Sequence, residues 1–489
     1  MRTLRRTALR AALGAACLAL PPGGAAPADA QGYRAEVRVR GDYIELRGLR
    51  RDSLPEEEVP GEGLRRRLTD GTIVTCTPGQ FCRWFASAET DGISLLTQDV
   101  SVAAWPGTVR GLSFHGHVRG RVGSEEFWPR TAQELDVLSA FARYDHRWFQ
   151  ARAGRQERAD GLGYFNFDGF AVTWKGFAPA RLEAFGGWSL ARGVNGPRTG
   201  DLLEEADVFA PDDRGLLFGV KGSARWGHRL AGSLVYQREI REDELALYSE
   251  RLAGNVRALF RGVAVDGSLR YDFAFEEFNE ARLRLTTPLP AELALTVEGR
   301  HYTPYFELWT IWGLFSPVGF DEGRAAVSWS APLNLRLQAG GAYRSYEDTH
   351  AEGAGDVLKD YGWRVFGSAG WSGEGWYADG TYRAETGFGS VRYGGDAAVG
   401  RRFGRRGYVS LRGTSTQTFG EFRFGEQTVT GGGIDGSWRV GEWRVDGSIG
   451  LYRLTFENRP SVEDWTQTRA HLGISYAFGT DTGEGGGYR

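Results

Sequence analysis

Residues 442–451 read Glu442-Trp443-Arg444-Val445-Asp446-Gly447-Ser448-Ile449-Gly450-Leu451, in which apolar and polar side chains alternate. Successive side chains of a β-strand point to opposite faces, so the apolar residues fall on one face and the polar residues on the other. The first face contains Trp443, Val445, Ile449 and Leu451, and the second contains Arg444, Asp446 and Ser448. One face suits lipid and the other suits water.

The same alternation recurs from about Asp99 to Phe478, for example in residues 261–275 and 290–300. Each alternating stretch is followed by a very short turn, a second stretch and a longer polar or glycine-rich connection, which is the pattern of successive β-hairpins. The composition agrees with an all-β chain, because 71 of the 489 residues are glycine and 13% are aromatic.

Composition also excludes other classes of protein. After the N-terminus the sequence has no apolar run of about 18 residues, so membrane-spanning helices are not expected, whereas a spanning β-barrel needs only alternation. The net charge is -3, which argues against a strongly basic nucleic-acid binder. The 59 basic residues include only three lysines, so arginine is the dominant cation.

Connection lengths and tryptophan placement distinguish a membrane barrel from a soluble β-sandwich, which would also alternate. Longer loops are expected at residues 193–213, 303–322 and 347–360. Tight turns are expected near Pro106-Gly107, Asp145-His146, Gly227, Pro288, Pro332, Ser372-Gly373, Gly404 and Gly441. Trp226, Trp371, Trp376, Trp438 and Trp443 flank these turns. Short turns at one end, long loops at the other and a tryptophan row at the headgroup level favour an outer-membrane barrel, with a soluble core as the alternative.

The hairpins predict a transmembrane antiparallel β-barrel of about 22 strands, with 18 to 24 compatible with the sequence. About ten hairpins precede a closing strand at residues 465–478, and one further strand comes from either Tyr33–Leu46 or residues 81–88. We expect a signal peptide at 1–30, an N-terminal segment at 31–95, the barrel at 96–478 and a flexible tail at 479–489. The N-terminal segment is too short for a large plug domain.

The N-terminus has the features of a cleaved secretory signal. Arg2, Arg5, Arg6 and Arg10 precede an apolar core, and Ala28-Asp29-Ala30 forms an A-x-A cleavage site. Loss of this segment removes four arginines and one aspartate and lowers the net charge to about -6. Cys76 and Cys82 then remain in an oxidising compartment, six positions apart around Pro78-Gly79, and predict a disulfide-closed hairpin rather than a metal site.

The C-terminal strand resembles the recognition motif of outer-membrane barrels. His471-Leu472-Gly473-Ile474-Ser475-Tyr476-Ala477-Phe478 has a polar residue, a glycine two positions later and aromatic residues three and five positions after that glycine. The resemblance implies that Gly473, Tyr476 and Phe478 are read by the barrel-assembly machinery.

A second resemblance covers Gly154-Arg155-Gln156 and residues 161–174, which begin Gly161-Leu162-Gly163-Tyr164-Phe165-Asn166-Phe167-Asp168-Gly169. This pattern is similar to the strand-loop-strand of porin-like barrels of the alginate-export type. The resemblance implies a wide barrel with an arginine-rich lumen that passes an anionic polysaccharide. It covers about twenty residues and assigns no individual substrate contact.

If the apolar face is outside, the polar face lines a pore in which arginine exceeds carboxylate. The pore-lining candidates are Arg270, Arg282, Arg284, Arg300, Arg336, Arg364, Arg383, Arg412 and Arg444. They predict an anion preference. The alternative is that these arginines pair with neighbouring acids, such as Glu298 and Asp446, and only satisfy a wet interior.

Residues 301–320 form an unusually apolar connection. Its aromatic and apolar side chains include Tyr305, Phe306, Trp309, Trp312 and Phe315. They suit either an inward constriction that stacks on sugars or apolar solutes, or an ordinary loop core.

The sequence therefore predicts an outer-membrane channel for passive passage of small or oligomeric hydrophilic solutes, anionic or carbohydrate, with an anion preference. A loop-blocked barrel with an adhesive, structural or assembly role is the alternative, and a barrel enzyme is a weaker one. We expect no catalytic site, metal or cofactor and no nucleic-acid partner, because His115 and His117 lack a supporting ligand and no G-x-S-x-G or P-loop is present. Outer-membrane lipid, the barrel-assembly machinery and the solutes are the expected partners.

Overall fold

The computed structural model describes residues 30–123, 135–177, 179–190, 215–241, 247–304, 319–347, 360–387, 390–421, 425–457 and 460–480. In this part of the chain, nearly every residue lies in a β-strand or in a connection between strands. No helix among these residues is long and apolar enough to cross a membrane.

The wall is built from twenty-two strands within the described residues. They are β1 (Ala30–Pro55), β4 (Phe81–Pro106), β5 (Leu112–Gly123), β6 (Leu135–Asp145), β7 (Phe149–Asp160), β8 (Gly163–Phe177), β9 (Ala180–Ser189), β10 (Gly215–Trp226), β11 (Leu230–Arg241), β12 (Leu247–Phe260), β13 (Val263–Asp272), β14 (Glu277–Leu289), β15 (Leu293–Tyr302), β16 (Phe320–Ala331), β17 (Leu335–Tyr346), β18 (Tyr361–Gly373), β19 (Trp376–Gly387), β20 (Ser390–Arg402), β21 (Gly407–Glu421), β22 (Gly425–Val440), β23 (Trp443–Glu457) and β24 (Trp465–Gly479). The remaining elements are β2 (Arg65–Arg67), β3 (Ile73–Cys76), and the 3-10 turns η1 (Glu56–Glu58) and η4 (Pro332–Asn334).

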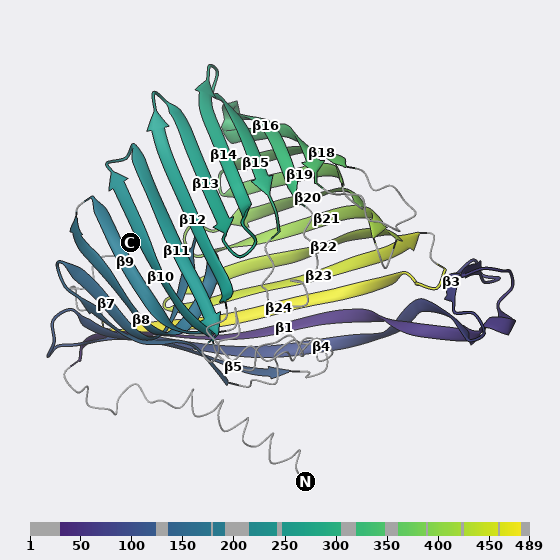
Figure 1. Cartoon of the computed structure of the whole chain (residues 1–489), viewed down its shortest axis with the longest axis horizontal. Helices are drawn as coiled ribbons and strands as arrows, with labels where there is room; N and C mark the ends of the chain where they lie inside the picture. The colour runs from purple at the N-terminus through teal and green to yellow at the C-terminus, as the bar shows by residue number, and fades with distance from the viewer. Residues whose placement is uncertain are drawn as a thin grey trace, which may run out of the picture.

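The strands close into a single antiparallel barrel. From β4 onward each strand pairs with the next one in the sequence, and β1 pairs with both β4 and β24. The closing seam runs from the pair Arg34 and Gly479 to the pair Ile44 and Arg469, and Figure 1 shows β1 and β24 side by side. The predicted barrel of about 22 strands is therefore confirmed.

Strand β1 contains the Tyr33–Leu46 segment, whereas residues 81–88 form the distal part of β4 and not a separate strand. The expected division between residues 95 and 96 falls inside β4. The predicted signal peptide lies outside the described residues except for Ala30, the first residue of β1. In the predicted tail, Gly479 still belongs to β24, and residues 481–489 lie outside the described part of the chain.

Short turns lie at the end of the barrel that contains both β1's start and β24's end. Residues 227–229, 261–262 and 441–442 are examples, of which the turn at 261–262 was not expected from the sequence. The turn expected near Pro288 was misplaced, because Pro288 lies within β14 and the chain turns at residues 290–292. There Ala291 and Glu292 take φ values of 61° and 60°, a left-handed turn that a periodicity pattern does not reveal.

The outer face of the wall is apolar. In β14, Leu283 and Leu285 are 52% and 41% exposed, and Arg282 and Arg284 point to the opposite face. The five tryptophans of the predicted row are all exposed and lie close to the short turns. Because lipid can cover such a surface and water cannot do so favourably, this is the surface of a barrel that spans a membrane.

Strands β1 and β4, at 26 residues each, are longer than the other wall strands. Their pairing with each other continues to Pro55 and Phe81, although β24 pairs with β1 only as far as Ile44 and β5 reaches β4 only at Leu95. Residues 45–94 therefore form an arm beyond the barrel wall, which Figure 1 shows in purple at the right. At about 3.3 Å per residue the paired part of this arm is about 35 Å long.

The tip of the arm has its own small core. Strands β2 and β3 pair with each other, β3 pairs with β4, and the disulfide between Cys76 and Cys82 joins β3 to β4. Val59 and Val74 pack against this disulfide, with Leu54, Leu68 and Trp84 around them. The predicted disulfide hairpin is thus present, and its position at the end of the arm is what the sequence did not reveal.

We expect reduction of this disulfide to loosen the tip without opening the barrel. Trypsin cleavage at residues 65–67 should then become about tenfold faster, because cleavage follows the population of the locally opened state. This increase corresponds to a loss of about 1.4 kcal/mol in the free energy of local opening. Cleavage at the exposed Arg405, in a short turn of the wall, serves as the control. Two alkylated thiols in the non-reduced protein would contradict the disulfide.

The orientation of the wall predicts opposite effects for arginine on its two faces. Leu283→Arg, at the middle of β14 on the apolar face, should lower the free energy of unfolding from lipid vesicles by about 2–4 kcal/mol. Thr414→Arg, at the middle of β21 on the polar face opposite Asp396, should change it by less than about 1 kcal/mol. Equal destabilisation by both variants in urea titrations would rule out the assigned orientation.

Candidate functional site

The polar face of the barrel wall carries the arginines predicted to line the pore. Leu269 in β13 and Val297 in β15 are exposed on the apolar face, so the next residues, Arg270 and Glu298, lie on the polar face. Strand pairing places three further arginines on this polar face, namely Arg282, Arg284 and Arg300. Alternation places Arg336, Arg364, Arg383, Arg412 and Arg444 on the same face of their own strands.

Many of these arginines are paired with carboxylates across neighbouring strands. Glu280 lies 3.4 Å from both Arg270 and Arg300, and Arg284 Nε is 2.5 Å from Glu298 Oε2. Because both charges of each pair lie on the same face, they cancel much of each other's long-range field.

A carboxylate shared by two arginines links β16, β17 and β18. Arg344 Nε donates a hydrogen bond to Glu322 Oε2 at 2.5 Å, Arg364 donates to the same oxygen, and Arg364 also reaches Glu385 at 4.0 Å. Glu322 is only 5% exposed, so two arginines hydrogen-bond a buried carboxylate.

The remaining predicted arginines differ in their partners. Arg412 Nε lies 2.6 Å from Asp435, and Arg444 Nε donates to the Ser437 hydroxyl at 3.1 Å. Among the described residues, no carboxylate partner is found for Arg282, Arg336 or Arg383. The polar face therefore combines paired arginines with a smaller set that no described acid neutralises.

Aromatic rings add to this face at the long-loop end. The Arg300 guanidinium lies 4.5 Å from the centre of the Tyr302 ring, and that of Arg344 lies 4.9 Å from the Phe320 ring. Stacking on a ring holds a guanidinium flat while leaving its edge free for hydrogen bonds. Each of these arginines is therefore held by a carboxylate and a ring together.

A buried aromatic cluster lies on the polar face of β7–β12 and was missed by the sequence analysis. Because Phe170 and Val172 are exposed on the outer face of β8, alternation places Phe165 and Phe167 on the other face, where they are 3% and 0% exposed. Leu162, Phe165, Phe167, Ala171, Phe185, Leu217, Val235 and Ala253 pack together. The alternating phenylalanines in residues 161–169 were the available signal.

Arg158 connects this cluster to the charged network. Its guanidinium lies 3.9 Å from the centre of the Phe185 ring, pairs with Glu183, and lies 3.8 Å from Asp160. The Arg158 side chain is 8% exposed, and those of Glu183 and Asp160 are 14% and 2% exposed. One buried cation thus serves two buried carboxylates and a ring.

The other predicted site residues have mixed outcomes. The stacking loop of Tyr305, Phe306, Trp309, Trp312 and Phe315 lies outside the described residues. In β24, the Tyr476 ring packs 4.5 Å from Trp443 and 5.5 Å from Phe478, and a Cβ at Gly473 would lie 2.7 Å from an Asp446 oxygen. Gly473 therefore permits a close approach within the wall.

The closed wall, apolar outside and charged inside, defines a porin-like outer-membrane β-barrel. No family model and no curated protein matches the chain. Among solved structures, the chain is similar to the outer membrane protein OpdK from Pseudomonas aeruginosa, with 10% identity over 92% of this chain and 99% of that one and a TM-score of 0.37. The chain is also similar to OccAB1 from Acinetobacter baumannii, with 11% identity over 93% of this chain and 100% of that one and a TM-score of 0.37. A third similar structure is a bacterial polysaccharide outer membrane secretin, with 10% identity over 61% of this chain and 98% of that one and a TM-score of 0.32. At these TM-scores the similarities are no basis for a functional statement, and the barrel is defined by its own strand pairing.

Removal of the Arg158 side chain should strongly destabilise the polar face of β7–β9. Arg158→Ala leaves two buried carboxylates uncompensated and should lower the free energy of unfolding by about 3–5 kcal/mol. The double variant Arg158→Met/Glu183→Gln should recover part of this loss, since it removes one carboxylate and restores packing against Phe185. Urea unfolding in lipid vesicles measures both, and equal stability of Arg158→Ala and the native chain would contradict the described pairing.

Proposed function

We propose that the chain is a passive outer-membrane channel for hydrophilic solutes. The observation that carries this proposal is the closed wall of twenty-two strands whose inner face is lined by arginine and carboxylate side chains. A barrel of this size encloses a lumen wider than side chains alone fill. A charged, wet lining lets polar solutes cross without meeting an apolar barrier.

The proposed selectivity is a weak preference for anions. Paired residues such as Arg284 and Glu298 contribute little net field, so the preference rests on arginines such as Arg336 and Arg383, for which the described residues supply no acid. Acidic saccharides and small carboxylates are the solute class that this lining suits. No covalent chemistry is part of the proposal.

The second candidate is a barrel whose lumen is blocked and whose role is adhesive, structural or connected with assembly. Two observations favour it: the aromatic cluster around Phe167 is buried although it lies on the polar face, and the arm at residues 45–94 extends beyond the wall. Such a barrel would present the arm without conducting.

Location and assembly complete the proposal. We propose that a signal peptide at residues 1–30 directs export of the chain towards the outer membrane, and that Gly473, Tyr476 and Phe478 are the residues read by the barrel-assembly machinery. Replacing Phe478 with alanine should then reduce the amount of folded barrel in outer-membrane fractions more than replacing the exposed Phe403 does.

Single-channel recording in planar bilayers separates the two candidates. An open channel gives stepwise current after insertion, whereas a blocked barrel gives none. Purified barrel that inserts into vesicles, as shown by its heat-dependent gel mobility, but gives no current steps would sink the channel proposal and favour the second candidate.

Charge removal from the lumen tests selectivity. Arg282→Gln/Arg336→Gln/Arg383→Gln should shift the reversal potential in a salt gradient towards cations, with a larger shift at about 0.01 M than at 1 M salt because screening is weaker. Arg405→Gln, in an exposed short turn, is the matched control and should leave the potential unchanged. An unshifted reversal potential of the triple variant at low salt would contradict the proposed anion preference.

A further inference from the structure

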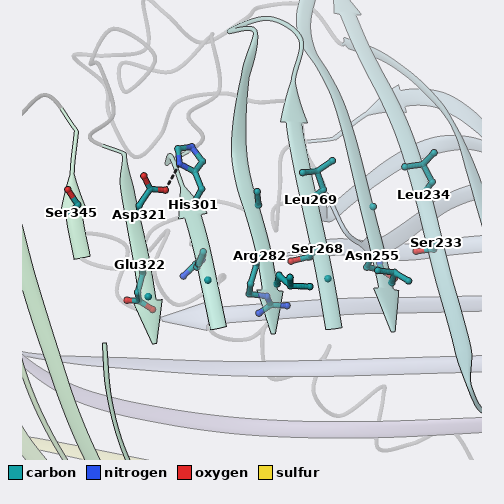
Figure 2. A pocket seen from close by; sticks show the side chains of 18 of the residues that line it. Ser233, Leu234, Asn255, Ser268, Leu269, Arg282, His301, Asp321, Glu322 and Ser345 are labelled. Atoms are coloured by element: carbon teal, nitrogen blue, oxygen red, sulfur yellow. Dashed lines mark hydrogen bonds and ion pairs between the residues drawn. The ribbon is translucent and has the colours of Figure 1, made fainter. Parts of the chain in front are cut away.

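Three potential metal ligands converge where strands β15–β17 end at the long-loop side of the barrel. His301 in β15, Asp321 in β16 and Glu347, the first residue after β17, each offer one ligand atom, and these atoms all lie within 4.8 Å of one another. His301 Nδ1 lies 3.0 Å from Asp321 Oδ1, and Figure 2 shows the two side chains pointing toward each other.

Strand register brings these residues together. His301 pairs directly with Asp321, and Asp321 pairs with Ser345, two positions before Glu347. The Glu347 N–H donates a hydrogen bond to the Gly319 carbonyl at 2.9 Å. The ligands therefore stand on a hydrogen-bonded sheet edge, which fixes their backbones without help from the connections.

The carboxylates of Asp321 and Glu347 have no arginine partner among the described residues, in contrast to the carboxylate of Glu322 on the polar face. Glu322, next to Asp321 in the sequence, is held by Arg344 and Arg364. Within the described part of the chain, no arginine or lysine pairs with Asp321 or Glu347, and the only ion-pair partner of Asp321 is His301. Two carboxylates and an imidazole thus meet without a fixed cation.

The group also faces outward and is accessible. His301 and Asp321 alternate with Arg300 and Glu322 and so share the face of Val297 and Val327, and the Asp321 side chain is 65% exposed. They lie at one end of a hollow of about 960 Å³ in the outer wall that includes Leu269 and Leu283 (Figure 2). An ion can therefore reach the group from outside the barrel without passing through the lumen.

We propose that His301, Asp321 and Glu347 form a binding site for a divalent transition metal of the Zn²⁺ type. Ligands at about 2.1 Å from one tetrahedral ion lie about 3.4 Å apart, so His301 Nδ1 and Asp321 Oδ1, at 3.0 Å, need to separate by only about 0.4 Å to bind a common ion. Imidazole favours Zn²⁺ and similar ions over Ca²⁺ and Mg²⁺, which prefer oxygen ligands alone. Three protein ligands leave further positions for water or an external group.

The second histidine with two carboxylates does not share this geometry. In the barrel seam, Nδ1 of His471 lies 2.8 Å from Asp42 and its Nε2 lies 2.9 Å from Asp446. The carboxylates bind opposite sides of the ring, so they hold the imidazole between them rather than converging on a common ion. We therefore expect the cluster of His301, Asp321 and Glu347 to bind the ion, and the cluster of Asp42, Asp446 and His471 not to bind it.

The test uses the full, tag-free chain in detergent micelles after treatment with a chelator. Equilibrium dialysis against Zn²⁺ should give one bound ion per chain, and Co²⁺ at the same site should give visible absorption bands that Zn²⁺ abolishes. His301→Ala should weaken binding by about 100-fold, and Asp321→Asn and Glu347→Gln should each weaken it at least tenfold, because loss of a ligand costs no less than loss of a residue that orients one.

Matched controls come from the short-turn end, where His228 and Glu374 are exposed. His228→Ala and Glu374→Gln should bind Zn²⁺ like the native chain, and a hundredfold excess of Ca²⁺ should not displace it. No bound Zn²⁺ in the native chain, or undiminished binding in folded Asp321→Asn and His301→Ala, would overturn the site. Displacement by Ca²⁺ would overturn the assigned metal class.

Discussion

The pairing of β1 with β24 leaves the wall with no open strand edge, and this closure governs the rest of the molecule. In hydrocarbon an unpaired backbone N–H or C=O costs several kcal/mol, so a sheet can cross a membrane only when every strand has two neighbours. Once the sheet is closed, the two faces of every strand meet different surroundings. The exposed Leu283 and the paired Arg284, adjacent in β14, are the direct result.

Inside the wall, the balance of charge matters more than the number of arginines. Glu322 with its two arginines, and Arg158 with its two carboxylates, show that cations and anions are distributed across strands in small networks rather than in ladders of one sign. Such networks keep a polar lining charged while limiting its net field. On the outer rim of the same wall, the carboxylates of Asp321 and Glu347 lie beside His301, and no arginine or lysine among the described residues pairs with either of them.

The alternation from about Asp99 to Phe478, together with the connection lengths and the tryptophan positions, predicted the barrel. It also predicted the face on which Arg284 or Arg412 lies, because successive side chains of a strand point to opposite faces and one of the faces is apolar. The partners of those arginines depend on register between strands, which a single sequence does not encode in a readable form. The same limit explains the missed cluster at Phe165 and Phe167: their spacing was visible, but their burial depends on what packs against them. His301, Asp321 and Glu347 are separated by connections and meet only through register.

The seam also has a consequence for the time course of assembly. Asp42 and His471 pair across it, although the residues between them make up nearly the whole chain. All other wall strands find their partner next to them in the sequence, so their hairpins can form as soon as both strands exist. Strands β1 and β24 lie near opposite ends of the chain, and contacts between residues so distant in the sequence are the slowest to form. Strand β4, of 26 residues, pairs with β1 on one side, so only the edge of β1 that faces β24 stays open until the barrel closes.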